Sequence, residues 1–179
     1  MGNALVQTLH EAGHPVTIWN RTRHRLQIDK LIELRAKFKQ DAEIAIGRSG
    51  RLVMICVLDY DAIYNALDKV PSFAGKTVVN LTNGSPSQST VAEEWFKRRQ
   101  AERYFNGAVM ATPELVGTAH SLLVSTTAKA KSNSAMSSLS WELWLPLTTS
   151  CPDAGSASRL DLAAFATMYG MFLGPCVGR

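Results

Sequence analysis

The residues of this sequence best suited to chemistry lie in four short segments, each directly after an apolar run. These segments are residues 20–22, 58–60, 82–84 and 110–112. Each segment is polar or small, whereas the runs before them have the length and composition of buried strands. An open parallel sheet binds ligands at the carboxyl ends of its strands. Four such junctions in series therefore predict a ligand crevice.

The first segment combines an amide with guanidinium groups. Dinucleotide sites place an acidic residue after the second strand, where it binds the ribose 2′-hydroxyl. Here Asn20 stands at that position, and Arg21, Thr22 and Arg25 follow it. A carboxylate would repel a 2′-phosphate, whereas a guanidinium binds it through paired hydrogen bonds. If the crevice binds a dinucleotide, these residues favour NADP. The alternative is a solvated, basic helix start.

Charge and composition argue against several other functions. Residues 1–51 hold nine Lys and Arg against five Asp and Glu, and the remaining residues hold ten of each kind. A nucleic-acid footprint usually spreads further, so this local excess favours an anion site over DNA or RNA binding. The three cysteines form neither a disulfide framework nor a metal set, which favours a reducing cytoplasm. No apolar run is long enough to span a membrane, and no secretory leader is expected.

The elements that must position these segments alternate between helix and strand patterns. Apolar residues at helical spacing predict a helix over residues 2–12, which Gly13 ends. Strands are predicted at residues 15–19, 52–57, 77–81, 104–110 and 121–125. Further helices are predicted at residues 23–39, 61–67 and 89–101, the last with Thr90 and Glu93 as a capping box. This order predicts an α/β fold, with a Rossmann-like, doubly wound parallel sheet over residues 1–125.

The last third of the sequence loses this alternation. Residues 126–152 are dense in serine and contain two tryptophans without a clear period, so we predict an irregular connection there. Within residues 153–179, a long apolar helix is predicted over 156–173. An apolar helix of this kind needs a partner surface.

The glycine-rich phosphate loop of dinucleotide-binding folds is incomplete in this sequence. Met1 and Gly2 precede the first helix, where a first strand and Gly-x-Gly-x-x-Gly would be expected. With Arg21 at its strand end, this pattern predicts a sheet that lacks its first strand and a sequence that begins at the last glycine. Gly2 would then allow close packing of the helix, whose N-terminus would still face a pyrophosphate.

Several sequence blocks in the right order carry a family resemblance. Residues 1–22 resemble the start of the β-hydroxyacid dehydrogenase superfamily, which includes 6-phosphogluconate dehydrogenase. Residues 153–171 resemble the start of that family's long interdomain helix. The blocks that most resemble the imine reductases are Cys56-Val-Leu-Asp-Tyr60, Val79-Asn-Leu-Thr-Asn-Gly-Ser-Pro86 and Asn106-Gly-Ala-Val-Met-Ala-Thr-Pro113.

The resemblance implies an NADP-binding domain, a connecting helix and a C-terminal helical domain that swaps between the protomers of a homodimer. Hydride would pass from the nicotinamide to a C=N or C=O carbon of a small imine or carbonyl, between the domains. By position, the resemblance implies Arg21, Thr22 and Arg25 at the 2′-phosphate, Leu58 and Asp59 at the adenosine and ribose, Asn83 and Ser85 near the nicotinamide, and Val109, Met110 and Thr112 at the substrate pocket.

The proton donor of that reaction is expected early in the long helix. The hydroxyacid dehydrogenases use a lysine there, and imine reductases often have an aspartate or tyrosine. This sequence offers Arg159 and Asp161. An arginine is a poor donor because its pKa exceeds about 12. A buried carboxyl group with a raised pKa can protonate an iminium nitrogen, which favours Asp161. The alternative is an aspartate that is satisfied on the helix surface.

Three departures from the family pattern bear on activity. Compared with that pattern, we expect the first strand with the leading glycines to be missing and the C-terminal domain to be missing, and the serine-rich stretch fits the family poorly. A truncated gene model or a degenerate paralogue explains all three, so we expect a fragment with little or no activity. A truncated, non-catalytic NADP-binding or interaction protein is therefore the alternative to an NADPH-dependent oxidoreductase.

Overall fold

A computed structural model describes residues 1–23, 25–118, 122–126 and 153–173. The elements follow the order α1 (Gly2–Glu11), β1 (Thr17–Trp19), α2 (Leu26–Glu33), β2 (Lys37–Lys39), α3 (Ala42–Arg48), β3 (Leu52–Ile55), α4 (Tyr60–Leu67), β4 (Thr77–Asn80), α5 (Pro86–Arg98), β5 (Arg103–Met110), η1 (Pro113–Leu115), β6 (Leu122–Thr126) and α7 (Ala154–Leu173). This order confirms the predicted α/β class, and α7 is the predicted long helix. The predicted irregular connection lies outside the described residues except for Thr126.

The strands form two sheets. β1 and β2 pair in parallel. β3, β4 and β5 form a second parallel sheet, to which β6 adds an antiparallel edge strand. Ile55, Asn80 and Asn106 are register partners. β3 and β4 therefore end at the same level, and the predicted segments 58–60 and 82–84 leave the sheet side by side.

The prediction of one helix over residues 23–39 is wrong. α2 stops before Arg35, which adopts a left-handed φ of 68°, and β2 then pairs with β1. The Lys-Phe-Lys pattern of β2 turns only Phe38 toward the core, where it packs against a cluster that includes Ile18 of β1 and Ile28 of α2. Two lysines in three residues hide this strand in the sequence, because strand formation depends on the pairing partner as well as on composition.

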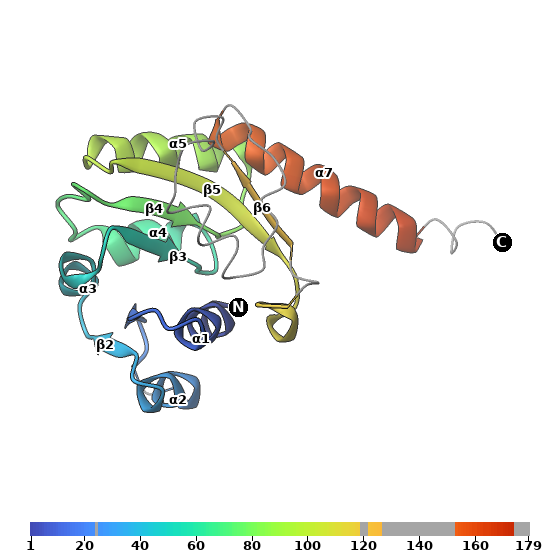
Figure 1. Cartoon of the computed structure of the whole chain (residues 1–179). Coiled ribbons are helices and arrows are strands. Elements are labelled where there is room, and N and C mark those ends of the chain that lie inside the picture. Colours follow the sequence, from blue (N-terminus) through green and yellow to red (C-terminus); the bar gives the residue numbers. More distant parts are fainter. Residues whose placement is uncertain (24, 119–121, 127–152, 174–179) are drawn as a thin grey trace.

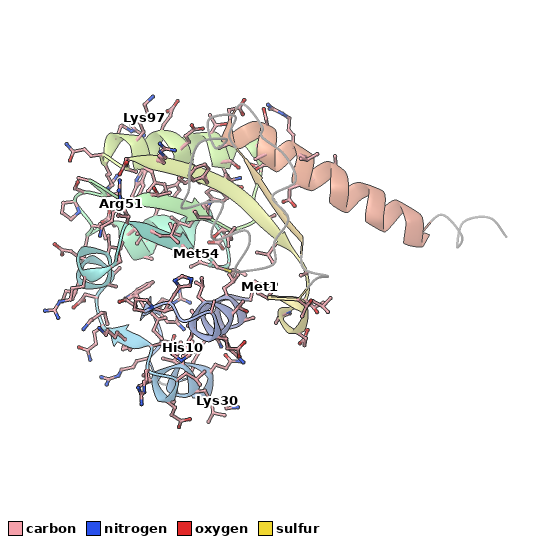
Figure 2. All side chains as sticks on the ribbon, viewed as in Figure 1. Met1, His10, Lys30, Arg51, Met54 and Lys97 are labelled. Atoms are coloured by element: carbon pink, nitrogen blue, oxygen red, sulfur yellow. The ribbon has the colours of Figure 1, made fainter. Side chains whose placement is uncertain are left out.

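Alternate residues of the central strands face opposite layers. Val78 packs in a cluster with residues of α3, α4, α5 and α7. Val79 packs in a second cluster that includes Leu5 of α1 and, at its margin, Met54. Figure 1 shows α1 beneath the four-stranded sheet and α5 with α7 above it. Lys97 lies on the outer surface of α5, away from both clusters (Figure 2). This three-layer order puts α1 and α7 on opposite faces of the sheet.

The start of α5 differs from the predicted capping box at Thr90 and Glu93. The helix begins at Pro86, and the box is made by Ser85 and Gln88. The backbone N–H of Gln88 donates to Ser85 Oγ at 3.2 Å, and the backbone N–H of Ser85 donates to the side-chain Oε1 of Gln88 at 2.9 Å. Proline suits the first helical position because its fixed φ is helical and it has no N–H to satisfy. Ser-Pro-x-Gln was therefore the signal to follow.

Candidate functional site

The loops after β3 and β4 are joined by a hydrogen bond. The Val57 amide donates to Thr82 Oγ1 at 3.2 Å, just beyond the ends of both strands. The N-terminus of α1 reaches the same edge, since a Cβ on Gly2 would lie 3.8 Å from the Cys56 carbonyl oxygen. That distance is an ordinary contact, so close packing is not what requires glycine at this position. The positive end of the α1 dipole therefore lies beside two of the predicted ligand segments.

The loop after β3 holds Leu58 and Asp59. Asp59 caps α4, and its Oδ1 accepts a hydrogen bond from the Ala62 amide at 2.8 Å. Helix capping is sufficient to explain an aspartate at this position, so its presence does not by itself indicate a bound ligand. Leu58 has no such role, because its side chain is 88% exposed. A large apolar side chain left in solvent at a strand end is suited to contact a bound ring or sugar.

The loop after β4 is held against Tyr60, which belongs to the predicted segment 58–60 but to which the sequence assigned no role of its own. A Cβ on Gly84 would stand within 2.6 Å of Tyr60 Cδ2 and 3.0 Å of Gln88 Oε1. Tyr60 is only 1% exposed, so its ring has little room to move away. Only glycine fits at position 84. Asn83 is exposed beside it, and Ser85 is occupied as the α5 cap.

The basic segment follows β1, in the two-stranded sheet. Asn20 is half-buried, and Arg21, Thr22 and Arg25 are exposed. Arg25 is the N-cap residue of α2. Neither Arg21 nor Arg25 forms an ion pair with another described residue. Both guanidinium groups are thus available to an anion.

The two candidates for the proton donor both lie on α7, but they differ in exposure to solvent. Arg159 is exposed, and its Nη2 donates to Ser156 Oγ at 2.9 Å and lies 3.8 Å from Asp153 Oδ1. Asp161 is only 6% exposed, and its Oδ1 forms no hydrogen bond in the described part of the chain. Burial raises the pKa of the Asp161 carboxyl group. The structure thus differs from the alternative of an aspartate satisfied on the helix surface.

The structure does not bring all the residues implied at the substrate pocket to the same side of the sheet as the Asp161 carboxyl group. Val109 packs at the margin of the α1-side cluster, whereas α7 packs on α5 and β5 from the opposite side. Thr112 is exposed and precedes η1. Met110 is the last residue of β5, and its side chain lies outside the described part. Val109 and Asp161 therefore belong to different layers.

Among the described residues, no group of three or more His, Cys, Asp or Glu side chains could hold a metal ion. None of the described helices is both long and apolar enough to cross a lipid bilayer.

Comparison with known proteins identifies the family. A family model described as the NAD binding domain of 6-phosphogluconate dehydrogenase matches residues 1–135. An NADPH-dependent reductive aminase of Aspergillus oryzae is 34% identical, over 97% of this chain and 58% of that protein.

Solved structures agree with this match. A reductive aminase from Aspergillus terreus in complex with NADPH and ethyl levulinate superposes with a TM-score of 0.86 at 36% identity, over 97% of this chain and 59% of that one. An imine reductase from Myxococcus stipitatus in complex with NADP+ has the same TM-score at 32% identity, over 98% and 60%. The chain thus spans about three fifths of the length of these relatives. Because the matched residues include both sheets and the segments at their strand ends, the chain belongs to the family of the 6-phosphogluconate dehydrogenase NAD-binding domain.

Proposed function

We propose that this protein binds NADP and takes part in the NADPH-dependent reduction of a C=N or C=O carbon in a small imine or carbonyl compound. The observation that carries this proposal is the buried carboxyl group of Asp161, whose Oδ1 has no hydrogen-bond partner in the described part. An unsatisfied buried polar atom is costly and calls for a functional explanation. The named activities of the reductive aminase and imine reductase relatives support the same reaction.

The residues at the strand ends fit NADP. Arg21, Thr22 and Arg25 are exposed and would hold the 2′-phosphate. The N-terminus of α1 would face the pyrophosphate, because helix N-termini attract anions. Leu58 and Asp59 would line the adenosine and ribose, and Asn83 and Ser85 would lie near the nicotinamide. The absence of a Cβ at Gly84 keeps that last loop seated on Tyr60.

Asp161 would hold a proton and donate it to the substrate nitrogen or oxygen. When bound, NADPH supplies the hydride that goes to the adjoining carbon. Burial favours the protonated carboxyl group, which is the form that a general acid needs. We assign this role to Asp161 rather than Arg159, because the arginine is exposed and is bonded at the start of α7. Met110 and Thr112 would contribute one edge of the substrate pocket, and Val109 would contribute to it from the α1 side of the sheet.

A second candidate function is favoured by the outer surface of α7. Leu160 and Leu162 are 37% and 48% exposed on this helix, and its C-terminal half extends past the sheet (Figure 1). A contiguous apolar patch on a protein surface often marks an interface. Under this hypothesis the protein binds NADP and associates with a second, homologous chain, in the cytoplasm, without catalysing a reaction itself.

A fluorescence titration of the 179-residue chain with NADPH, and with NADH as the control, tests the first step. We expect NADPH to bind at least about tenfold more tightly than NADH, since each charge-assisted contact to the 2′-phosphate adds about 1.5 to 3 kcal/mol. Equal affinity for the two cofactors would contradict the assignment of Arg21 and Thr22. Reduction of cyclic imines by the bound NADPH then separates the enzyme from the non-catalytic protein.

A further inference from the structure

Six polar side chains form a buried cluster between the four-stranded sheet and the helices α4, α5 and α7. We call it the polar cluster. Five elements contribute to it: α4, β4, α5, β5 and α7. Its members, none more than 9% exposed, are Tyr60, Asn80, Ser89, Tyr104, Asn106 and Ser158. Six buried polar groups on one face of a sheet are unusual, because each loses its hydration and must find a partner within the protein.

Asn106 is the centre of the polar cluster. Its Oδ1 accepts hydrogen bonds from the Tyr60 hydroxyl at 2.9 Å and from Asn80 Nδ2 at 3.1 Å. Its Nδ2 donates to Ser158 Oγ at 3.0 Å and approaches Ser89 Oγ at 3.4 Å. The carbonyl end of this amide thus faces α4 and β4, while its amino end faces α5 and α7. One side chain of β5 joins both groups of elements.

The polar cluster also holds the loop of residues 82–85 at both ends. Asn80 Oδ1 accepts a hydrogen bond from the Thr82 amide at 3.1 Å, at the start of the loop. Ser89 Oγ donates to the Ser85 carbonyl oxygen at 3.0 Å, at its end. Gly84, between them, rests on the ring of Tyr60, which is itself a member. Little freedom is left to the backbone that carries Asn83.

The same cluster reaches the helix of Asp161. Ser158 bonds to Ser89 Oγ as well as to Asn106, and it lies three residues before Asp161, on the same side of α7. The first turn of α7 packs closely on α5, where a Cβ on Gly155 would lie 2.8 Å from Thr90 Oγ1 and 3.3 Å from the Pro86 carbonyl oxygen. Hydrogen bonds therefore run from the loop after β4 to the helix turn that positions Asp161.

We propose that Asn80, Asn106 and Ser158 are positioning residues that hold the loop of residues 82–85 and Asp161 in one fixed relative arrangement. Apolar packing alone is non-directional and would let α7 slide on α5. A satisfied buried hydrogen-bond network specifies one geometry, because each displacement leaves a donor or acceptor unpaired. The claim that this arrangement aligns the hydride and the proton with the substrate rests on the proposed function. The claim that α7 is coupled to the loop does not.

Amide hydrogen exchange of the unliganded chain tests the coupling. Ser158→Ala removes one hydroxyl from α7 and introduces the best helix former. We expect the Thr82 and Ser85 amides to exchange about tenfold faster, as for the loss of one buried hydrogen bond, while the Lys37 amide in β2 keeps its rate. Ser156→Ala is the matched control, because Ser156 lies on the same helix and its hydroxyl, among the described residues, bonds to Asp153 and Arg159 and to no member of the polar cluster. Unchanged loop amides, or equal acceleration at Lys37, would overturn the proposal.

A binding comparison connects the coupling to the cofactor. Ser158→Ala should weaken NADPH several-fold and leave 2′-phospho-ADP-ribose, which has no nicotinamide, unaffected. If both ligands weaken equally, the polar cluster has no specific effect on the nicotinamide side and the proposal fails there. If the unaltered chain binds neither ligand, the proposed function fails instead, and the exchange rates alone decide whether α7 and the loop are coupled.

Discussion

Gly84 lies against the ring of Tyr60 so closely that a Cβ at position 84 would come within 2.6 Å of Tyr60 Cδ2. Tyr60 cannot retreat, because its ring is buried and its hydroxyl bonds to Asn106 and Ser89. The glycine therefore lets the loop after β4 descend onto the polar cluster. This contact fixes the position of the neighbouring residue Asn83 relative to the edge of the sheet.

Gly84→Ala should therefore destabilise the protein by about 1 to 3 kcal/mol, the usual effect of forcing an extra carbon into a packed interior. Urea unfolding measures this change. Gly47→Ala is the matched control, since Gly47 lies in α3 with nothing within 4 Å of its added Cβ. That substitution should stabilise the protein by about 0.4 to 1 kcal/mol. Similar effects from both variants would show that the Tyr60 contact does not limit position 84.

Arg21→Ala should lower the affinity for NADPH by about 10- to 100-fold, the loss of one charge-assisted hydrogen-bonded contact to the 2′-phosphate. The affinity for NADH, which has no 2′-phosphate, should stay within about twofold. Fluorescence titration measures both. Arg98→Ala, at the exposed end of α5, controls for the loss of one positive charge. A parallel loss of NADPH and NADH binding would place Arg21 elsewhere than at the 2′-phosphate.

Asp161→Asn should lower the turnover of a small imine by about 10²- to 10⁴-fold, the range for removing a general acid. The NADPH dissociation constant should change little, because the carboxyl group lies on α7 rather than on the strand-end loops. Asp68→Asn, an exposed carboxyl group at the end of α4, is the control. Undiminished turnover in Asp161→Asn would remove Asp161 from the mechanism, and so would an equal loss in both variants.

The pH dependence of stability should also report on Asp161. Its pKa is raised in the folded state by burial, so its protonated form favours folding. This contribution is fully present below the unfolded pKa of about 3.9 and is lost as pH rises through the folded pKa. Asp161→Asn cannot ionise, so its urea midpoint should exceed that of the unaltered protein at pH 7 and converge with it near pH 4. A constant difference across this range would count against a buried, titrating carboxyl group.

Asp153 should have the opposite pH dependence. Hydrogen bonds from the Ser156 amide and hydroxyl lower the pKa of this carboxyl group. Its contribution to stability is therefore present above the unfolded pKa and is lost as pH falls through the folded pKa. Asp153→Ala should thus destabilise the protein at neutral pH and become neutral in acid. Unfolding of both aspartate variants over one pH series separates the two effects.

Much of the fold could be predicted from local patterns. The apolar runs at residues 52–57 and 77–81 contain β3 and β4, and the predicted stop at Gly13 has a left-handed φ of 87°. These predictions succeed because periodicity and backbone freedom are properties of neighbouring residues. The strand after α2 was missed, because Lys37 and Lys39 show no strand signal and Arg35 turns the chain without a glycine.

The sequence by itself determined most of the helices and strands outside residues 23–39, and which residue types follow each strand, because hydrophobic pattern and turn chemistry act over a few residues. It also presented Arg21 and Asp161 as candidates through their types and positions. Only the tertiary structure decided that Asp161 is buried while Arg159 is solvated, and that Asn106 and Ser158, 52 residues apart, share a hydrogen bond. Burial and long-range pairing depend on how the layers pack against one another, and no local pattern in a single sequence carries that information.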